Sequence, residues 1–168
     1  RSSWIINNIL ICIMKPYVIA EMGVNFYDTA KKLNINPLEA AKMYIDAAAE
    51  AGIDCAKFQS YKAGTIVSKN SPAYWDLTKE PTKTQYELFL KHDSFGECEY
   101  RELCKYTHDK GMDFTSTPFD YASADYLYDM VDFYKISSSD LSNLPFIHHI
   151  GAKGKPVFVS VGAAYLSE

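Results

Sequence analysis

The segment Asp54-Cys55-Ala56-Lys57-Phe58-Gln59-Ser60 decides the fold class of this chain. Its short apolar body is typical of a buried strand. It follows an alanine-rich helical pattern that begins at Asn36-Pro37 and is stopped by Gly52. Asn36 is a favourable N-cap and Pro37 a favourable first helical residue. A helix that leads directly into a buried strand is typical of an α/β protein with a parallel sheet.

The same alternation of short apolar runs and helical patterns continues along the chain. Strands are predicted over Tyr17–Ala20 (ending at Glu21), Asp113–Thr117, Phe133–Ser137 and Pro156–Ser160. Helices are predicted over Asp120–Met130 and Asn143–Lys153. A further helix is expected to be capped by Ser94-x-x-Glu97, to end at Gly111 and to present the apolar face Tyr100, Leu103, Cys104 and Thr107. About the first four and a half units of a (β/α)8 TIM barrel are therefore expected.

Chain length and composition limit how much of the barrel is present and which kinds of partner the chain can have. The chain has 168 residues, whereas a complete barrel typically needs roughly 250, so we expect a truncated barrel. Residues 15–168 are predicted to form its N-terminal part, and residues 1–14 a leader or an extension across the barrel bottom. The chain is 48% apolar with a net charge of −4 and no basic stripe, which disfavours nucleic acid as a partner. The apolar run Trp4–Met14 is too short to cross a bilayer.

The cysteines and histidines give little indication of a metal or redox site. The four cysteines show neither C-x-x-C nor zinc-ligand spacing, so buried and reduced thiols in a cytoplasmic protein are expected. His92, His108, His148 and His149 stand away from the predicted strand ends and are interpreted as surface residues. Tyr74-Trp75, in the long excursion after Ser60, can be a lid or simple packing.

Polar residues end every predicted strand, where the active sites of parallel βα proteins lie. Lys57 and Lys135 are the most informative, because burying an ammonium group costs several kcal/mol unless a partner compensates it. Two such lysines with Ser and Thr hydroxyls between them predict a site for a small anion with two or three charges, such as a phosphorylated carboxylic acid. Glu21 can pair with a lysine or act on a proton or water. Singly, either lysine can instead reach solvent, and Glu21 can be a structural ion-pair partner.

Seven motifs, in family order, resemble the sialic acid synthase family. They are Ala20-Glu21-Met22-Gly23-Val24-Asn25, Ala56-Lys57-Phe58-Gln59, Thr115-Ser116-Thr117-Pro118-Phe119, Tyr134-Lys135-Ile136-Ser137-Ser138, Asn143-Leu144-Pro145, Gly154-Lys155-Pro156-Val157 and Ser160-Val161-Gly162. The resemblance implies a TIM-barrel transferase that condenses phosphoenolpyruvate with an N-acylated amino sugar, such as N-acetylmannosamine. The products implied are a nonulosonic acid and phosphate.

The resemblance also implies roles for individual residues. Glu21 falls on the catalytic carboxylate of the family. Phosphoenolpyruvate-binding positions fall on Lys57, Thr117, Lys135, Ser138 and Ser160. Sugar-binding positions fall on Gln59, Asp140 and Asn25, although many members have Glu where Asp140 stands. The family uses a divalent metal, Mn or Mg, held by two histidines of later strands, so no metal ligand is expected in this chain. The resemblance also implies that the full-length protein forms a domain-swapped homodimer.

Departures from the family pattern leave alternatives open. Many members have His and then Gly after Asn25, whereas Phe26-Tyr27-Asp28 and several extra residues follow it here. This fits a subgroup that makes another nonulosonate, such as legionaminic or pseudaminic acid. The chain by itself is expected to be inactive. A related phosphoenolpyruvate-dependent aldol-type synthase and a non-catalytic half-barrel that binds an anion or a partner remain the other interpretations.

Overall fold

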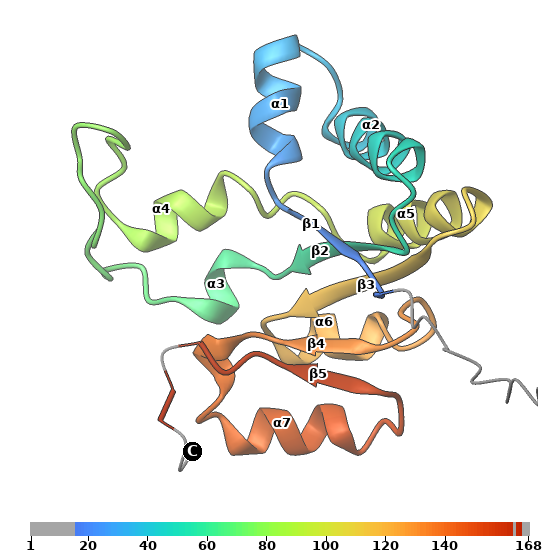
Figure 1. Cartoon of the computed structure of the whole chain (residues 1–168). Coiled ribbons are helices and arrows are strands. Elements are labelled where there is room, and N and C mark those ends of the chain that lie inside the picture. Colours follow the sequence, from blue (N-terminus) through green and yellow to red (C-terminus); the bar gives the residue numbers. More distant parts are fainter. Residues whose placement is uncertain (1–15, 163, 166–168) are drawn as a thin grey trace, which may run out of the picture.

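The computed structural model describes residues 16–162, 164 and 165 (Figure 1). The predicted leader or barrel-bottom extension at 1–14 lies outside this part of the chain. The elements in chain order are β1 (Ile19–Gly23), α1 (Phe26–Leu33), α2 (Pro37–Glu50), β2 (Cys55–Ser60), α3 (Ala63–Ile66), α4 (Gln85–Leu90), α5 (Glu97–Asp109), β3 (Asp113–Pro118), α6 (Tyr121–Tyr126), β4 (Tyr134–Ile136), the 3₁₀ turn η1 (Ser138–Asp140), α7 (Leu144–Gly151) and β5 (Val157–Val159).

The strands confirm the predicted parallel βα arrangement. β1, β2 and β3 form one parallel sheet in chain order, and β4 pairs in parallel with β5. The backbone N–H of Asp132 donates to the carbonyl of Phe114 at 3.0 Å, which joins the start of β4 to β3. Among the described residues the strands do not close into a barrel. No helix in this part of the chain combines the length and apolarity needed to cross a membrane.

Residue alternation in β2 explains why the core and the polar pocket lie on opposite faces of the sheet. Phe58 is fully buried and stacks on Phe114 of β3 with ring centroids 5.8 Å apart. Helices α2 and α5 contribute buried residues such as Ile45 and Leu103 to the same core. Lys57, one residue from Phe58, points to the other face because successive strand side chains alternate. Because Phe58 faces the core, the Lys57 side chain points toward the polar pocket.

Helix α1 is an element that the alternation did not predict. Phe26 and Tyr27, expected only as extra residues before the next helix, are both buried in it. The ring of Phe26 stacks on Phe95, with centroids 4.9 Å apart, and the Tyr27 hydroxyl accepts a hydrogen bond from the Phe95 backbone N–H at 2.9 Å. These contacts join segments nearly seventy residues apart. Packing against a distant segment, rather than a local sequence signal, accounts for this helix.

The predicted helix caps are confirmed at one site and wrong at another. The Asn36 side chain accepts a hydrogen bond from the Leu38 N–H at 2.8 Å, as expected for an N-cap. The N-cap of α5 is Gly96 and not Ser94, and the Glu99 carboxylate accepts from the Gly96 N–H at 2.8 Å. The Ser94 hydroxyl instead donates to the Tyr27 hydroxyl at 3.1 Å. The apolar face predicted for this helix is confirmed as its buried set.

Residues 61–93, called the excursion below, lie beyond the carboxyl ends of β2 and β3 (Figure 1). Asp120, the N-cap of α6, attaches the excursion to the sheet because its carboxylate accepts from the Thr65 hydroxyl at 2.5 Å. The Lys62 ammonium group donates to the Phe95 carbonyl at 2.8 Å on the other side. Trp75 donates its indole N–H to carbonyls within the excursion, at 3.1 and 3.2 Å. The excursion is therefore held at defined points, and its helices border the site described next.

Candidate functional site

The polar residues at the carboxyl ends of the strands line one pocket of about 230 Å³. Every strand from β1 to β5 contributes a residue, either within the strand or just beyond its end. The lining residues are Glu21, Lys57, Gln59, Thr117, Phe119, Lys135, Ser137, Ser138 and Ser160. All of the site residues predicted from the sequence are here except Asn25 and Asp140. We call this cavity the strand-end pocket.

Lys57 is the buried cation of the strand-end pocket. Its side chain is 11% exposed and forms an ion pair with Glu21, whose side chain is 50% exposed. Burial, followed by the positive charge of Lys135, lowers the pKa of Lys57 to about 8. The Glu21 carboxylate acts in the opposite direction, because an adjacent negative charge favours the protonated ammonium group. Lys57 is thus a cation that loses its charge at a lower pH than an exposed lysine does.

Lys135 holds the second positive charge of the strand-end pocket. Its ammonium group donates to the Ile136 carbonyl at 2.8 Å and to the Ser160 hydroxyl, which links β4 to the end of β5. Burial lowers the pKa of Lys135 as well. The pocket therefore combines two desolvated ammonium groups with the hydroxyls of Thr117 and Ser138, which is an arrangement suited to an anion with several oxygen acceptors.

A backbone irregularity occurs at the end of β1, next to the carboxylate of the pocket. The register with β2 shifts between Glu21 and Gly23, and Gly23 has φ of +55°, a conformation that favours glycine. A Cβ atom at Gly23 would lie 3.4 Å from the Gln59 Nε2 and 3.5 Å from the Glu21 Oε1. These are ordinary contact distances, so glycine is favoured at this position by its positive φ rather than by a lack of space.

A second pocket of about 400 Å³ adjoins the first and shares Gln59 and Phe119 with it. Its other lining residues come from the excursion and from the segment after β4. They are Tyr61, Thr65, Ile66, Gln85, Phe89, Ser139, Asp140 and Asn143. We call it the excursion pocket. Of this set, the sequence predicts only Gln59 and Asp140 as site residues, because no motif in the excursion marks its inward-facing residues.

Asp140 is the charged residue of the excursion pocket. Its Oδ2 is buried and has no hydrogen-bond partner among the described residues, while its Oδ1 accepts from the Asn143 amide at 3.4 Å. Burial raises the pKa of Asp140, and the Asn143 contact opposes that effect. A buried acceptor without a partner is costly unless a bound group satisfies it. Asn25, by contrast, lines neither pocket; it is the exposed N-cap of α1.

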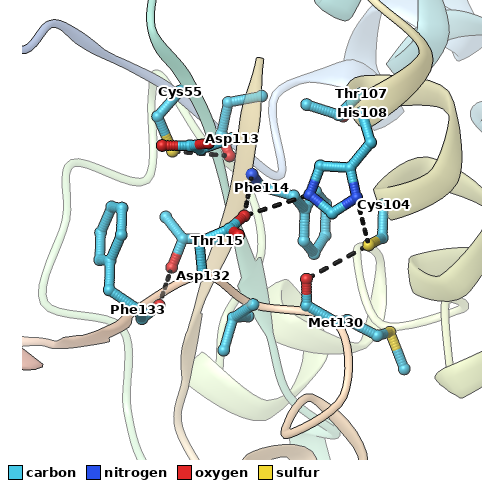
Figure 2. Close-up of polar contacts among 12 residues, drawn as sticks. Cys55, Cys104, Thr107, His108, Asp113, Phe114, Thr115, Met130, Asp132 and Phe133 are labelled. Atoms are coloured by element: carbon cyan, nitrogen blue, oxygen red, sulfur yellow. Dashed lines mark hydrogen bonds and ion pairs between the residues drawn. The ribbon is translucent and has the colours of Figure 1, made fainter. Parts of the chain in front are cut away.

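A row of cysteine, histidine and aspartate at the opposite ends of the strands is structural (Figure 2). The Cys104 Sγ lies 3.7 Å from the His108 Nδ1, and the His108 Nε2 lies 3.1 Å from an Asp132 carboxylate oxygen. The thiol, however, donates to the Met130 carbonyl at 3.2 Å, and burial raises the pKa of Cys104 to about 11. A thiol held protonated in this way is a poor nucleophile. The expectation of buried thiols holds for Cys55 and Cys104 but is wrong for Cys98, which is exposed, while Cys12 lies outside the described residues.

The described residues do not fit a metal site. No group of three or more His, Cys, Asp or Glu side chains that could hold an ion occurs in residues 16–162, 164 and 165. Among the described residues that line the strand-end pocket, Glu21 is the only carboxylate, and it is paired with Lys57.

Sequence comparisons match this chain to curated synthases. The sequence profile of the NeuB family matches residues 44–168. The N,N′-diacetyllegionaminic acid synthase of Legionella pneumophila is 35% identical over 158 residues, which are 92% of this chain and 42% of that protein. Human N-acetylneuraminate-9-phosphate synthase is 30% identical over 87% of this chain and 39% of its own length. The chain thus spans about two fifths of the length of these relatives.

Solved structures show the same fold. The N-acetylneuraminic acid synthetase of Leptospira borgpetersenii, in complex with citrate, aligns with a TM-score of 0.72 at 28% identity. The alignment covers 90% of this chain and 46% of that one. A truncated 3-deoxy-D-arabino-heptulosonate 7-phosphate synthase from Thermotoga maritima aligns with a TM-score of 0.52 at 13% identity over 85% of this chain and 39% of its own, and so shares the fold alone. The parallel βα units therefore match part of the TIM-barrel synthases.

Proposed function

Because the chain belongs to the NeuB family, we propose that its strand-end pocket binds phosphoenolpyruvate for condensation with an N-acylated amino sugar. The proposed reaction forms a carbon–carbon bond and yields a nonulosonic acid of the sialic acid type and inorganic phosphate. Phosphoenolpyruvate is a cytoplasmic metabolite, so the cytoplasm is the proposed place of action. The proposed assembly of the full-length protein is a homodimer.

The observation that carries this proposal is the pair of desolvated lysines in one pocket. Phosphoenolpyruvate has a carboxylate and a phosphate on adjacent positions, and so carries two or three negative charges. Lys57 and Lys135 match this charge, and the hydroxyls of Thr117, Ser138 and Ser160 supply donors for the remaining oxygens. Burial strengthens each of these contacts because the local dielectric constant is low.

In the proposed mechanism, the electron pair of the C2–C3 double bond of phosphoenolpyruvate forms a bond from C3 to the aldehyde carbon of the open-chain sugar. The aldehyde oxygen takes up a proton and becomes a hydroxyl group, and C2 is left electron-poor. Water then adds at C2, and the tetrahedral product loses phosphate as its C2–O bond breaks. The lysines hold the carboxylate and phosphate throughout and stabilise the departing phosphate. Glu21 lies beside Lys57 in the same pocket, where its carboxylate can orient the water and accept its proton.

The test of the proposal is the binding of phosphoenolpyruvate to this chain, measured by isothermal titration calorimetry. Replacing Lys57 or Lys135 with Met should weaken binding by about 10- to 100-fold, the usual range for losing a charge-assisted hydrogen bond. Lys79→Met is the matched control, because Lys79 is an exposed residue of the excursion that lines neither pocket. Absence of binding, or equal binding by all variants, would contradict the proposal.

A second measurement separates synthesis from simple binding. Phosphate release is followed with phosphoenolpyruvate, N-acetylmannosamine and manganese. Release of phosphate that requires the sugar supports the synthase. Binding of phosphoenolpyruvate without release of phosphate is the result expected of this chain by itself, which spans about two fifths of the length of its relatives.

The names of the relatives suggest a second class of acceptor. The Legionella enzyme is named for a product with two N-acetyl groups, and phosphoenolpyruvate contains no nitrogen. An acceptor for such a product carries both acylamino groups itself. We therefore consider two acceptors for this chain, one with a single acylamino group and one with two.

A further inference from the structure

The excursion pocket distinguishes between these two acceptors. It adjoins the strand-end pocket and shares Gln59 and Phe119 with it. The sugar aldehyde must meet C3 of phosphoenolpyruvate, so the reacting end of the acceptor lies at these shared residues. The rest of the acceptor then extends toward the excursion.

One wall of the excursion pocket is aromatic. The ring of Tyr61 packs edge-on against Phe89 of α4, with centroids 5.6 Å apart, and against Phe119, with centroids 6.1 Å apart. Ile66 of α3 completes this apolar wall. Hydroxyl groups of a sugar gain little from such a surface, whereas the methyl group of an acyl substituent is stabilised by it.

A primary amide lies beside the aromatic wall. The Gln85 Nε2 donates to the Pro72 carbonyl at 3.0 Å, which holds the side chain in one orientation. No hydrogen bond to its Oε1 occurs among the described residues, so that oxygen can accept from the N–H of a bound amide. An apolar wall next to a fixed amide is complementary to an acylamino group, which has a methyl at one end and an N–H at the other.

The wall is held by the sheet rather than by the excursion alone. Tyr61 directly follows β2 and Phe119 directly follows β3, and the Phe119 N–H donates to the Ser60 carbonyl at 3.0 Å. On the excursion side, the Thr65 hydroxyl is fixed on Asp120. The pocket is therefore formed before a ligand enters, which favours selective binding.

We propose that the excursion pocket, through Phe89, Gln85, Tyr61 and Ile66, binds a second acylamino group on the part of the acceptor sugar distant from the aldehyde. Phe89 and Gln85 are then specificity-determining residues. This inference rests on the proposed function, because it takes the acceptor to react at the strand-end pocket. The substrate class it names is a diacylamino sugar rather than N-acetylmannosamine.

The experiment compares two sugars on the protein saturated with phosphoenolpyruvate. The probes are N-acetylmannosamine and a mannose derivative with acetamido groups at C2 and C4, each titrated by calorimetry or ligand-observed NMR. The derivative should bind about tenfold more tightly, since filling an apolar subsite is worth at least that factor. Phe89→Ala and Gln85→Met should each remove most of the difference without changing phosphoenolpyruvate affinity.

The control is Leu90→Ala on the same helix, because Leu90 is 51% exposed and lines neither pocket. It should keep the full preference. Equal binding of the two sugars, including no detectable binding of either, overturns the inference, and so does a preference that persists in both Phe89→Ala and Gln85→Met. Phosphoenolpyruvate binding is measured first in every sample. Its loss in the unchanged protein contradicts the proposed function, whereas its retention without a sugar preference contradicts only this inference.

Discussion

Glu21 and Lys57 are direct register partners across β1 and β2, and their side chains form an ion pair. The two partners differ in burial, because the Lys57 side chain is 11% exposed and that of Glu21 is 50% exposed. The carboxylate can therefore turn toward solvent, whereas the ammonium group stays in the strand-end pocket. An anion that enters the pocket competes with Glu21 for Lys57.

Replacing Glu21 with Gln should tighten phosphoenolpyruvate binding by about fivefold, because a half-exposed ion pair is worth on the order of 1 kcal/mol. Calorimetry measures this change, and Glu39→Gln on the exposed face of α2 is the control. Weaker binding by Glu21→Gln would show that the carboxylate helps to hold the ligand rather than competing with it.

The affinity for phosphoenolpyruvate should fall as the pH rises, because the pKa of Lys57 is about 8. Below that pH the ammonium group is charged and binds the anion; above it the neutral amine does not. Between about pH 7 and pH 9 the charged fraction falls roughly tenfold, while the phosphate is already ionised throughout. Lys57→Arg, which stays charged, should flatten the profile. A flat profile in the unchanged protein would assign the anion-binding charge to other groups.

Asp120→Ala should loosen the excursion. The carboxylate of Asp120 accepts from the Thr65 hydroxyl at 2.5 Å and from the Ser123 N–H at 2.7 Å, so its loss removes both a tether and a helix cap. The free energy of unfolding should fall by about 1–3 kcal/mol, measured by urea denaturation. Limited proteolysis within residues 61–93 should also become faster. Asp129→Ala, at an exposed position of the segment after α6, should change neither property.

Asp132→Ala should destabilise the protein without changing phosphoenolpyruvate affinity. Its carboxylate accepts from the Phe114 N–H at 2.9 Å at the amino ends of the strands, away from the strand-end pocket. A loss of about 1–2 kcal/mol is expected. Asp132→Asn keeps an acceptor for that N–H and should lose less. A changed affinity in Asp132→Ala would show that the two ends of the strands are coupled.

The fold class and the strand-end pocket could be predicted because their signals are local. A strand ends where apolar residues give way to polar ones, and parallel strands bring such ends together, so Lys57 and Lys135 could be paired from spacing alone. The ion pair of Lys57 with Glu21 was one of the alternatives left open, since it depends on the register of two strands.

Other features depend on contacts that a single sequence does not encode locally. Phe26 of α1 is buried because Phe95 stacks on it. The N-cap of α5 is Gly96 rather than the predicted Ser94, because the Ser94 hydroxyl donates to the Tyr27 hydroxyl. The excursion pocket was missed for the same reason. Tyr61 and Phe89 meet across nearly thirty residues without a periodic pattern.

The contacts that Asp120 and Lys62 make at the base of the excursion allow this segment to be exchanged between related proteins. A segment tied to the sheet at its base can be transplanted as a cassette, provided that the recipient keeps the acceptor at position 120 and the carbonyl at position 95. Chimaeras that swap residues 61–93 should therefore fold with the strand-end pocket unchanged, because none of its lining residues belongs to the excursion. The excursion side of the neighbouring pocket would change with the donor segment.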